Sequence, residues 1–189
     1  MKLLIKPEPG DFFYIPAVDE FNVNGFVIAR YIEYIKPNLG HLIEVFKQFY
    51  TEPPEKISDV NTNERLFRPI FCSMRFSGIP RWKILFSNPG YDKSESGYEN
   101  ISFAFGSSIW VGGETKDVAI EAQGDIEPSI CWRMDHIIFR VIAHLHGFLD
   151  QNDTMNYHKL PVDYREDNHI AAERVHEVAD RMSEKFKLW

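Results

Sequence analysis

The sequence predicts an α+β fold in which a β-rich region, residues 10–125, precedes two C-terminal helices, residues 132–149 and 167–187. The first two thirds of the chain alternate β-branched and aromatic runs with Gly, Pro and Asn turn signals. The last third carries apolar residues at helical spacing instead. Because strands followed by helices are typical of α+β folds, we expect a bent antiparallel sheet or partly open β-barrel. It would have roughly six to eight strands and form a single domain, residues 1–189, with both helices.

The first three predicted strands are "DFFYIP" (11–16), "GFVIARYIEYI" (25–35) and "GHLIEVFKQFY" (40–50). Between the last two, "KPNLG" (36–40) supplies Pro, Asn and Gly and predicts a hairpin. Both alternating faces of 25–35 are largely apolar, so this strand is expected at the centre of the sheet, covered on both sides. We interpret the aromatics Phe12, Phe13 and Tyr14 as core residues, since acids rather than bases surround them.

Four later runs also have strand character, and a polar loop separates two of them. Pro69 lies inside the first run and favours an edge strand or a bulge there. The loop, residues 87–100, is expected to be exposed. The third run contains "FGSSIWVGG" and is interpreted as one strand with a bulge or tight corner. The four runs are residues 65–76, 81–87, 99–113 and 117–122.

The helical segments follow from spacing and from their ends. Within 135–148, apolar residues recur at helical spacing and Gly147 is a plausible stop. Residues 167–186 show the clearest apolar stripe in the chain, with charged residues around it.

Composition excludes several classes of protein. The net charge of −7 disfavours a nucleic-acid binder, whose affinity comes largely from cations that meet phosphates. No apolar run is long enough to span a membrane, and "KPEPG" interrupts the N-terminal apolar stretch too early for a signal peptide. We therefore expect a cytoplasmic protein. Cys72 and Cys131 are far apart and are interpreted as two buried thiols rather than a disulfide or a zinc site.

Histidines on the two predicted helices are the main candidates for catalysis. Each helix carries a polar triplet on one face: His136, Arg140 and His144 on the first, and His169, Glu173 and His176 on the second. A metal-dependent enzyme built on these side chains is the alternative function. An arginine at the centre of the first triplet disfavours a cation, and carboxylate-bridged metal sites need more Glu-x-x-His elements than the one present. We therefore expect no metal, no cofactor and no enzymatic activity.

Acidic residues gather in three segments. Residues 88–99 carry three acids against one lysine, 113–127 carry five against one lysine, and 150–167 carry five against two bases. Such runs are either solvated or form a docking face for a basic partner. The candidate partner-binding residues come from the first two segments and are Asp92, Glu95, Glu99, Glu114, Asp117 and Glu121.

The stretch "GDFFYIP" followed by "NGFVIARYIEYI" resembles the start of the immunity protein 26 family of bacterial polymorphic toxin systems. Members of that family begin with a Gly-Asp-aromatic-aromatic-x-Ile-Pro strand and continue with a Gly-Phe-x-x-Ala-Arg-like strand. The resemblance covers about the first 50 residues and extends through "PRWKIL" (80–85), but does not cover the final helix. The matching positions are Gly10, Asp11, Phe12, Phe13, Ile15, Pro16, Gly25, Phe26, Ala29 and Arg30.

The resemblance implies a mostly β protein that binds a cognate toxin and blocks it by occlusion. It carries over no catalytic residue, because the matching positions look structural. Immunity proteins often present acidic faces to basic toxin domains, so the expected partner is a protein toxin domain such as a basic nuclease. No nucleic acid or membrane partner is expected. A small β-barrel that binds a peptide or nucleic acid through exposed aromatics is a third interpretation.

Overall fold

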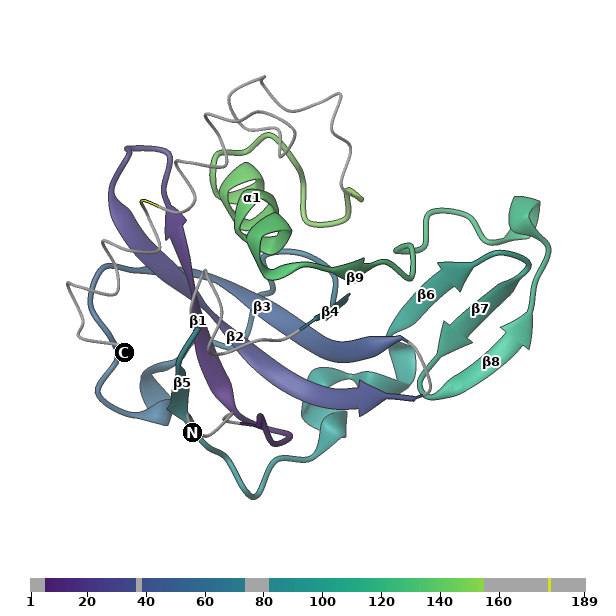
Figure 1. Ribbon diagram of the computed structural model, residues 1–189, viewed down its shortest axis with the longest axis horizontal. Helices are drawn as coiled ribbons and strands as arrows, with labels where there is room; N and C mark the ends of the chain where they lie inside the picture. The colour runs from purple at the N-terminus through teal and green to yellow at the C-terminus, as the bar shows by residue number, and fades with distance from the viewer. Residues whose placement is uncertain (1–5, 37–38, 74–81, 155–176, 178–189) are drawn as a thin grey trace, which may run out of the picture.

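The computed structural model describes residues 6–36, 39–73, 82–154 and 177. In this part of the chain, nine strands form two sheets and one α-helix packs on the larger sheet (Figure 1). The larger sheet has the order β5-β1-β2-β3-β4-β9, with strands β1 (Phe12–Val18), β2 (Asn24–Ile35), β3 (Gly40–Tyr50), β4 (Ile70–Cys72), β5 (Ile84–Phe86) and β9 (Cys131–Trp132). The smaller sheet has the order β6-β7-β8, with strands β6 (Ser102–Phe105), β7 (Ser108–Val111) and β8 (Glu114–Asp117).

The long antiparallel strands β1, β2 and β3 form the centre of the larger sheet. The predicted pairing of residues 25–35 with 40–50 is confirmed, and most of β2 is buried on both faces. Between β1 and β2, the Asp19 carboxylate accepts hydrogen bonds from the backbone N–H groups of Phe21 and Val23. The pairing of β2 with β3 shifts register twice, and such bulges bend a strand and increase its twist.

One face of the larger sheet packs against helix α1 (Met134–Leu145). Phe13, Ile15 and Val27 from the sheet share a core with apolar residues of α1 such as Ile138 and Val141. The chain leaves the helix through Gly147, whose φ of 70° lies in the left-handed region that favours glycine. The predicted first helix, 132–149, is therefore confirmed in its central part, but it starts later because Trp132 belongs to β9.

The opposite face of the larger sheet holds a second, aromatic core. Phe12 and Tyr14 of β1 pack there with Phe26, Phe46 and Tyr50. The prediction that Phe12, Phe13 and Tyr14 are interior is confirmed, since each is at most 3% exposed. At this stretch the interpretation as an exposed aromatic platform is therefore wrong.

A third core joins the two sheets. Ile32 of β2 and Phe71 of β4 pack there with Phe103 of β6 and Trp110 of β7. The rings of Phe71 and Phe103 lie 4.1 Å apart between their centroids. Figure 1 shows the smaller sheet beyond the end of the larger sheet at which β2 finishes and β3 begins.

The predicted fold class is wrong. An open sheet is compatible with the six strands of the larger sheet, but the described residues form a second sheet as well, and β4 pairs with β9 in parallel. The described residues contain one α-helix of more than two turns, not two C-terminal helices. The second predicted helix, 167–187, falls almost wholly outside the described residues. Within those residues, no helix is long and apolar enough to cross a lipid bilayer.

The predicted strands after residue 65 also needed correction. Residues 99–113 form a hairpin, β6–β7, because the chain reverses at Gly106 in a left-handed conformation. Residues 114–117 form β8, while part of the predicted strand 117–122 is the 3₁₀ helix η4 (Ile120–Ala122). Three further 3₁₀ helices are η1 (Ile57–Asp59), η2 (Lys93–Ser96) and η3 (Tyr98–Asn100). Pro69 lies just before β4.

Candidate partner-binding surface and groove

The positions that carry the family resemblance are interior. All ten of them, from Gly10 to Arg30, are buried. A Cβ added at Gly10 would lie 2.5 Å from the backbone oxygen of Asn88, and one at Gly25 would lie 2.4 Å from that of Tyr50. Since real Cβ atoms do not approach so closely, packing requires glycine at both places. These residues build the scaffold rather than a site.

Arg30 of β2 links residues 91–96, which follow β5, to the larger sheet through hydrogen bonds. Its Nε donates to Glu44 Oε1 at 2.7 Å, and its Nη2 donates to Ser96 Oγ at 3.1 Å. Arg65 donates from Nε to the other oxygen of Glu44 at 2.7 Å. Arg30 also lies over the Tyr91 ring, with 4.7 Å between Cζ and the ring centroid. This buried network fixes residues 91–96, where two predicted site residues lie.

Asp92 and Glu95, two of the predicted site residues, form a capping box on η2. The Asp92 carboxylate accepts the backbone N–H of Ser94 at 2.8 Å, and Glu95 Oε1 accepts that of Asp92 at 3.2 Å. Hydrogen bonds from Ser94 lower the pKa of Asp92. Glu95 also accepts a bond from Arg30 Nη1 at 3.1 Å. Both acids are exposed, but both also hold the local structure.

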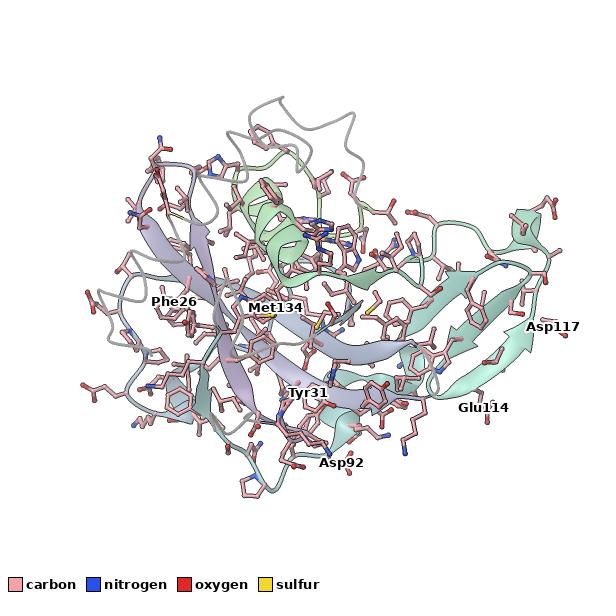
Figure 2. The ribbon with its side chains drawn as sticks, in the orientation of Figure 1. Phe26, Tyr31, Asp92, Glu114, Asp117 and Met134 are labelled. Carbon is pink, nitrogen blue, oxygen red and sulfur yellow. The ribbon has the colours of Figure 1, made fainter. Side chains whose placement is uncertain are left out.

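Four predicted site residues lie on or beside the smaller sheet. Every residue of β8, including Glu114 and Asp117, is exposed, and Glu121 is exposed on η4 (Figure 2). Glu99 lies next to the β7–β8 turn, because a Cβ at Gly112 would be 2.9 Å from its Cα. The structure thus brings Glu99 close to the start of β8. In Figure 2, Asp92 lies under the larger sheet, apart from Glu114 and Asp117.

Two other acids of the segment 113–127 have basic partners. The Asp125 side chain is 77% exposed and pairs with Arg68 at 3.3 Å. Glu127 is buried and forms a two-point ion pair with Arg140, whose Nη2 donates to Oε2 at 3.0 Å. For Glu127 the prediction of a solvated or docking role is wrong, because the side chain is buried and bound to Arg140. Arg140 lies in α1, so the local run of acids did not reveal this partner.

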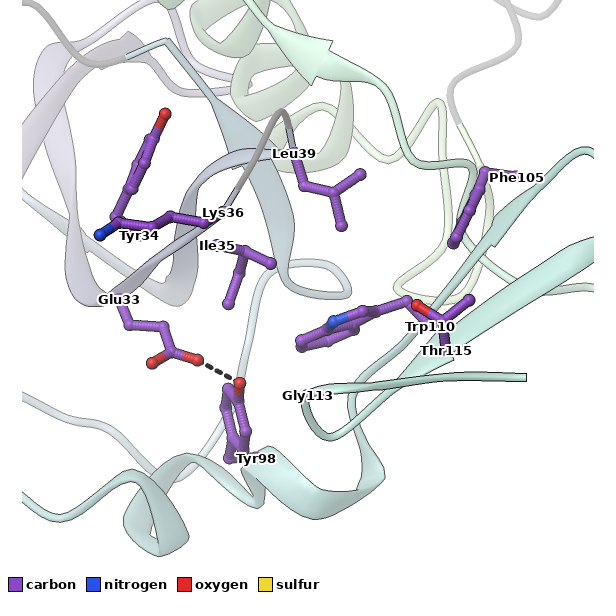
Figure 3. A pocket seen from close by; sticks show the side chains of 10 residues that line it. All are labelled: Glu33, Tyr34, Ile35, Lys36, Leu39, Tyr98, Phe105, Trp110, Gly113 and Thr115. Atoms are coloured by element: carbon purple, nitrogen blue, oxygen red, sulfur yellow. Dashed lines mark hydrogen bonds between the residues drawn. The ribbon is translucent and has the colours of Figure 1, made fainter.

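A groove of about 590 Å³ opens between the end of the β2–β3 hairpin and the smaller sheet (Figure 3). Its apolar walls come from both sides: Ile35 and Leu39 from the hairpin end, and Phe105 and Trp110 from β6 and β7. Thr115 of β8 also lines the groove. The remaining lining residues are Glu33, Tyr34, Lys36, Tyr98 and Gly113.

Glu33 organises one side of the groove. It accepts hydrogen bonds from the Tyr98 hydroxyl and, at 2.9 Å, from Lys93 Nζ. Lys93 Nζ also lies 4.1 Å from the centroid of the Tyr98 ring. Burial and the neighbouring Glu33 raise the pKa of Tyr98, so its hydroxyl keeps its proton. The Tyr98 ring in turn meets Trp110 edge-on, at 5.7 Å between centroids and 87° between planes.

The histidine triplet on α1 does not form an open site. Arg140 is fully buried and bound to Glu127, and His144 is buried against the Phe67 ring at 5.0 Å between centroids. Burial, followed by the Arg140 charge, lowers the pKa of His144 to about 3. No group of three His, Cys, Asp or Glu able to hold a metal occurs in the described residues. The second triplet, His169, Glu173 and His176, lies outside them.

The two cysteines are free thiols, as expected, but only Cys72 is buried while Cys131 is exposed. Burial raises the pKa of both thiols. The raised pKa values oppose the thiolate form, which is the form in which a nucleophilic cysteine reacts.

Sequence reasoning missed the groove. It treated 87–100 as an open polar loop and 105–113 as a single bulged strand, so Tyr98 and Trp110 had no assigned role. The Gly112-Gly113 dipeptide between alternating runs is a hairpin signal that would have revealed β8. No local sequence pattern predicts that the end of the β2–β3 hairpin packs beside Tyr98, Trp110 and Thr115.

Comparison with protein-family models, curated proteins and solved structures finds no match. The resemblance to the immunity protein 26 family therefore depends on the sequence patterns within residues 10–85 alone.

Proposed function

We propose that the protein binds a cognate bacterial protein toxin and neutralises it by covering the toxin's working surface. It acts in the cytoplasm, without catalysis and without a cofactor. One observation carries this proposal: strand β8, which presents the exposed acids Glu114 and Asp117, also contributes Thr115 to an aromatic groove between the smaller sheet and the β2–β3 hairpin. The N-terminal resemblance to the immunity protein 26 family supports it independently.

The charge of this region favours a basic partner. Residues 88–125 contain seven acids and two lysines, and the acids of β8 are exposed. A surface of one sign attracts a partner of the opposite sign during diffusion, which speeds association and excludes partners of like charge. A basic toxin domain, such as a nuclease, has the required complementarity.

Combining an aromatic groove with a charged rim favours protein binding. Interfaces concentrate their free energy in a few aromatic and aliphatic contacts that exclude water, and polar residues surround these contacts. Here Trp110 and Phe105 supply the apolar centre, while Glu99 and Glu114 lie on adjoining segments.

Co-expression tests the proposal in cells. The toxin domain encoded beside this gene is induced with and without the protein, and we expect growth to be rescued only when the protein is present. Continued cell death despite intact, folded protein would reject the proposal.

Charge reversal then tests the surface. Replacing Glu114, Asp117 and Glu121 by Lys should slow association with the toxin domain by about tenfold or more at low salt and flatten its salt dependence. A control variant reverses three exposed acids at the other end of the molecule: Glu20, Glu52 and Glu55. Equal slowing in both variants would remove the β8 acids from the site.

A further inference from the structure

Strand β8 presents a free backbone edge next to the groove. The β7–β8 hairpin turns through two residues, Gly112 and Gly113, both in the left-handed region, so Val111 and Glu114 form the pair that flanks the turn. In a two-residue hairpin this flanking pair is hydrogen-bonded, and the bonding alternates along the strands. The backbone groups of Thr115 and Asp117 therefore point away from β7. Among the described strands, β8 pairs with β7 alone.

The same edge is continuous with the groove. Thr115 lies opposite Trp110 in the register, and both line the groove, whereas Lys116 lies opposite Ile109 on the other face of the sheet. A strand added beside β8 would thus place every second side chain on the groove side, next to Thr115.

We propose that the partner supplies an extended, basic segment that adds to β8 as a fourth strand and inserts one apolar side chain into the groove. This inference rests on the proposed function and names the chemistry of the segment that the site binds. Backbone pairing would supply affinity, and the groove would supply selectivity for the inserted side chain.

Charge sets the rest of the segment's chemistry. Glu114 and Asp117 lie on opposite faces of β8, so a segment running beside it meets a carboxylate on each face. Basic side chains on both faces would complement them. The inserted side chain is apolar, because Leu39, Phe105 and Trp110 form the walls and the Glu33 carboxylate in the lining is already bonded to Tyr98 and Lys93.

Charge also argues against a second copy of this chain as the occupant. Two copies that met at β8 would bring together the segment 88–125 of each, which carries seven acids and two lysines. A surface of one sign disfavours a partner of the same sign. Self-association through β8 is thus disfavoured.

A matched pair of variants tests the inference on the full chain and the toxin domain encoded beside it. Thr115→Trp places an indole over the groove, while Lys116→Trp places the same indole on the opposite face of the same strand. We expect Thr115→Trp to raise the dissociation constant by about tenfold or more, the size of a strong single contact at an interface. Lys116→Trp should change it by less than about threefold.

A third variant separates backbone pairing from groove filling. Thr115→Pro removes an N–H group that points away from β7, so the β7–β8 pairing is retained while strand addition loses a donor. We expect weakened toxin binding with an unchanged melting temperature. It also keeps the inference testable if the indole at 115 prevents folding.

The outcomes are distinct. If the unaltered protein binds the toxin domain but Thr115→Trp and Thr115→Pro bind as tightly as Lys116→Trp, the inference is wrong and the proposed function stands. If the unaltered protein does not bind the toxin domain at all, the proposed function fails and the inference with it. A dimer in solution that Thr115→Trp dissociates would assign β8 to a second copy and overturn the inference.

Discussion

The two sheets of this protein divide scaffold from surface. Every residue of β1 in the larger sheet is buried, whereas every residue of β8 in the smaller sheet is exposed. The positions that resemble an immunity family all belong to the buried part, whereas most of the candidate binding acids belong to the exposed part and the groove lies between the two sheets. A recognisable motif can therefore identify the scaffold of a protein without touching its binding surface.

The same division appears in the carboxylates. Glu44 is buried and accepts hydrogen bonds from Arg30 and Arg65, whereas Glu114 is 77% exposed with Lys116 at 3.9 Å. Breaking a buried pair leaves an uncompensated charge in the interior, but an exposed pair in water is worth little. Four changes test this contrast, in order of expected effect on stability.

Glu44→Ala should have the largest effect. It leaves the buried Arg30 guanidinium without its main carboxylate, so the free energy of unfolding should fall by about 3–5 kcal/mol. Urea denaturation followed by circular dichroism measures the change. Glu114→Ala is the control and should change stability by less than about 0.5 kcal/mol. Similar losses in both variants would contradict the division into scaffold and surface.

His144 should make the free energy of unfolding decrease when the pH is lowered. Its pKa is about 3 in the folded protein and about 6.5 in the unfolded chain. Because the unfolded state binds more protons between these values, the free energy of unfolding decreases as the pH drops through this window. From pH 7 to pH 5, His144 should account for about 2 kcal/mol of the decrease.

His144→Leu removes this titrating group from the core, so its stability should fall less over the same pH range. Urea denaturation at both pH values gives the difference. Ile142→Val, a change in the same helix that involves no titrating group, should retain the full decrease. An unchanged pH dependence in His144→Leu would show that His144 is not buried as described.

Tyr98→Phe should have an intermediate effect. It removes the hydroxyl that donates to Glu33 but keeps the ring against Trp110, so the expected loss is about 1 kcal/mol. Thermal unfolding measures it. Tyr34→Phe, at an exposed tyrosine on the rim of the same groove, should be neutral. Equal stability of the two variants would mean that the Tyr98–Glu33 bond does not order the groove.

Reversing the charges of Glu114, Asp117 and Glu121 should affect stability least. Each residue is exposed, so each change should cost less than about 0.5 kcal/mol. The same triple variant should slow association with the proposed toxin domain strongly. Changes in the smaller sheet should therefore have the larger effect on binding, whereas changes in the larger sheet have the larger effect on stability. A strongly destabilised triple variant would contradict the assignment of these acids to the surface.

Local patterns predicted much of the larger sheet. Alternating apolar residues and the "KPNLG" turn predicted β2 and β3, and the spacing of residues such as Val141 and Leu145 predicted α1. Local patterns could not predict the arrangement of the strands in two sheets. That arrangement depends on a turn at Gly106 that divides one apparent strand into β6 and β7, on a second turn at Gly112-Gly113 that leads into β8, and on packing between Phe71 and Phe103.

The candidate site was predicted in part. The six acids are exposed as expected, because runs of charge seldom become buried. Sequence did not reveal that Glu95 also holds Arg30, or that Glu127 is buried against Arg140. Both partners lie in other elements of the fold. The groove joins Leu39 to Trp110 for the same reason, and only the folded chain brings them together.

Hydrogen–deuterium exchange of the protein with and without the toxin domain that we propose as its partner tests the central claim most directly. The account predicts slowed exchange in β8 and in residues 93–100, with little change in the β1–β2 turn or in α1. Protection confined to the β1–β2 turn or α1, with β8 exchanging as fast as in the free protein, would contradict it.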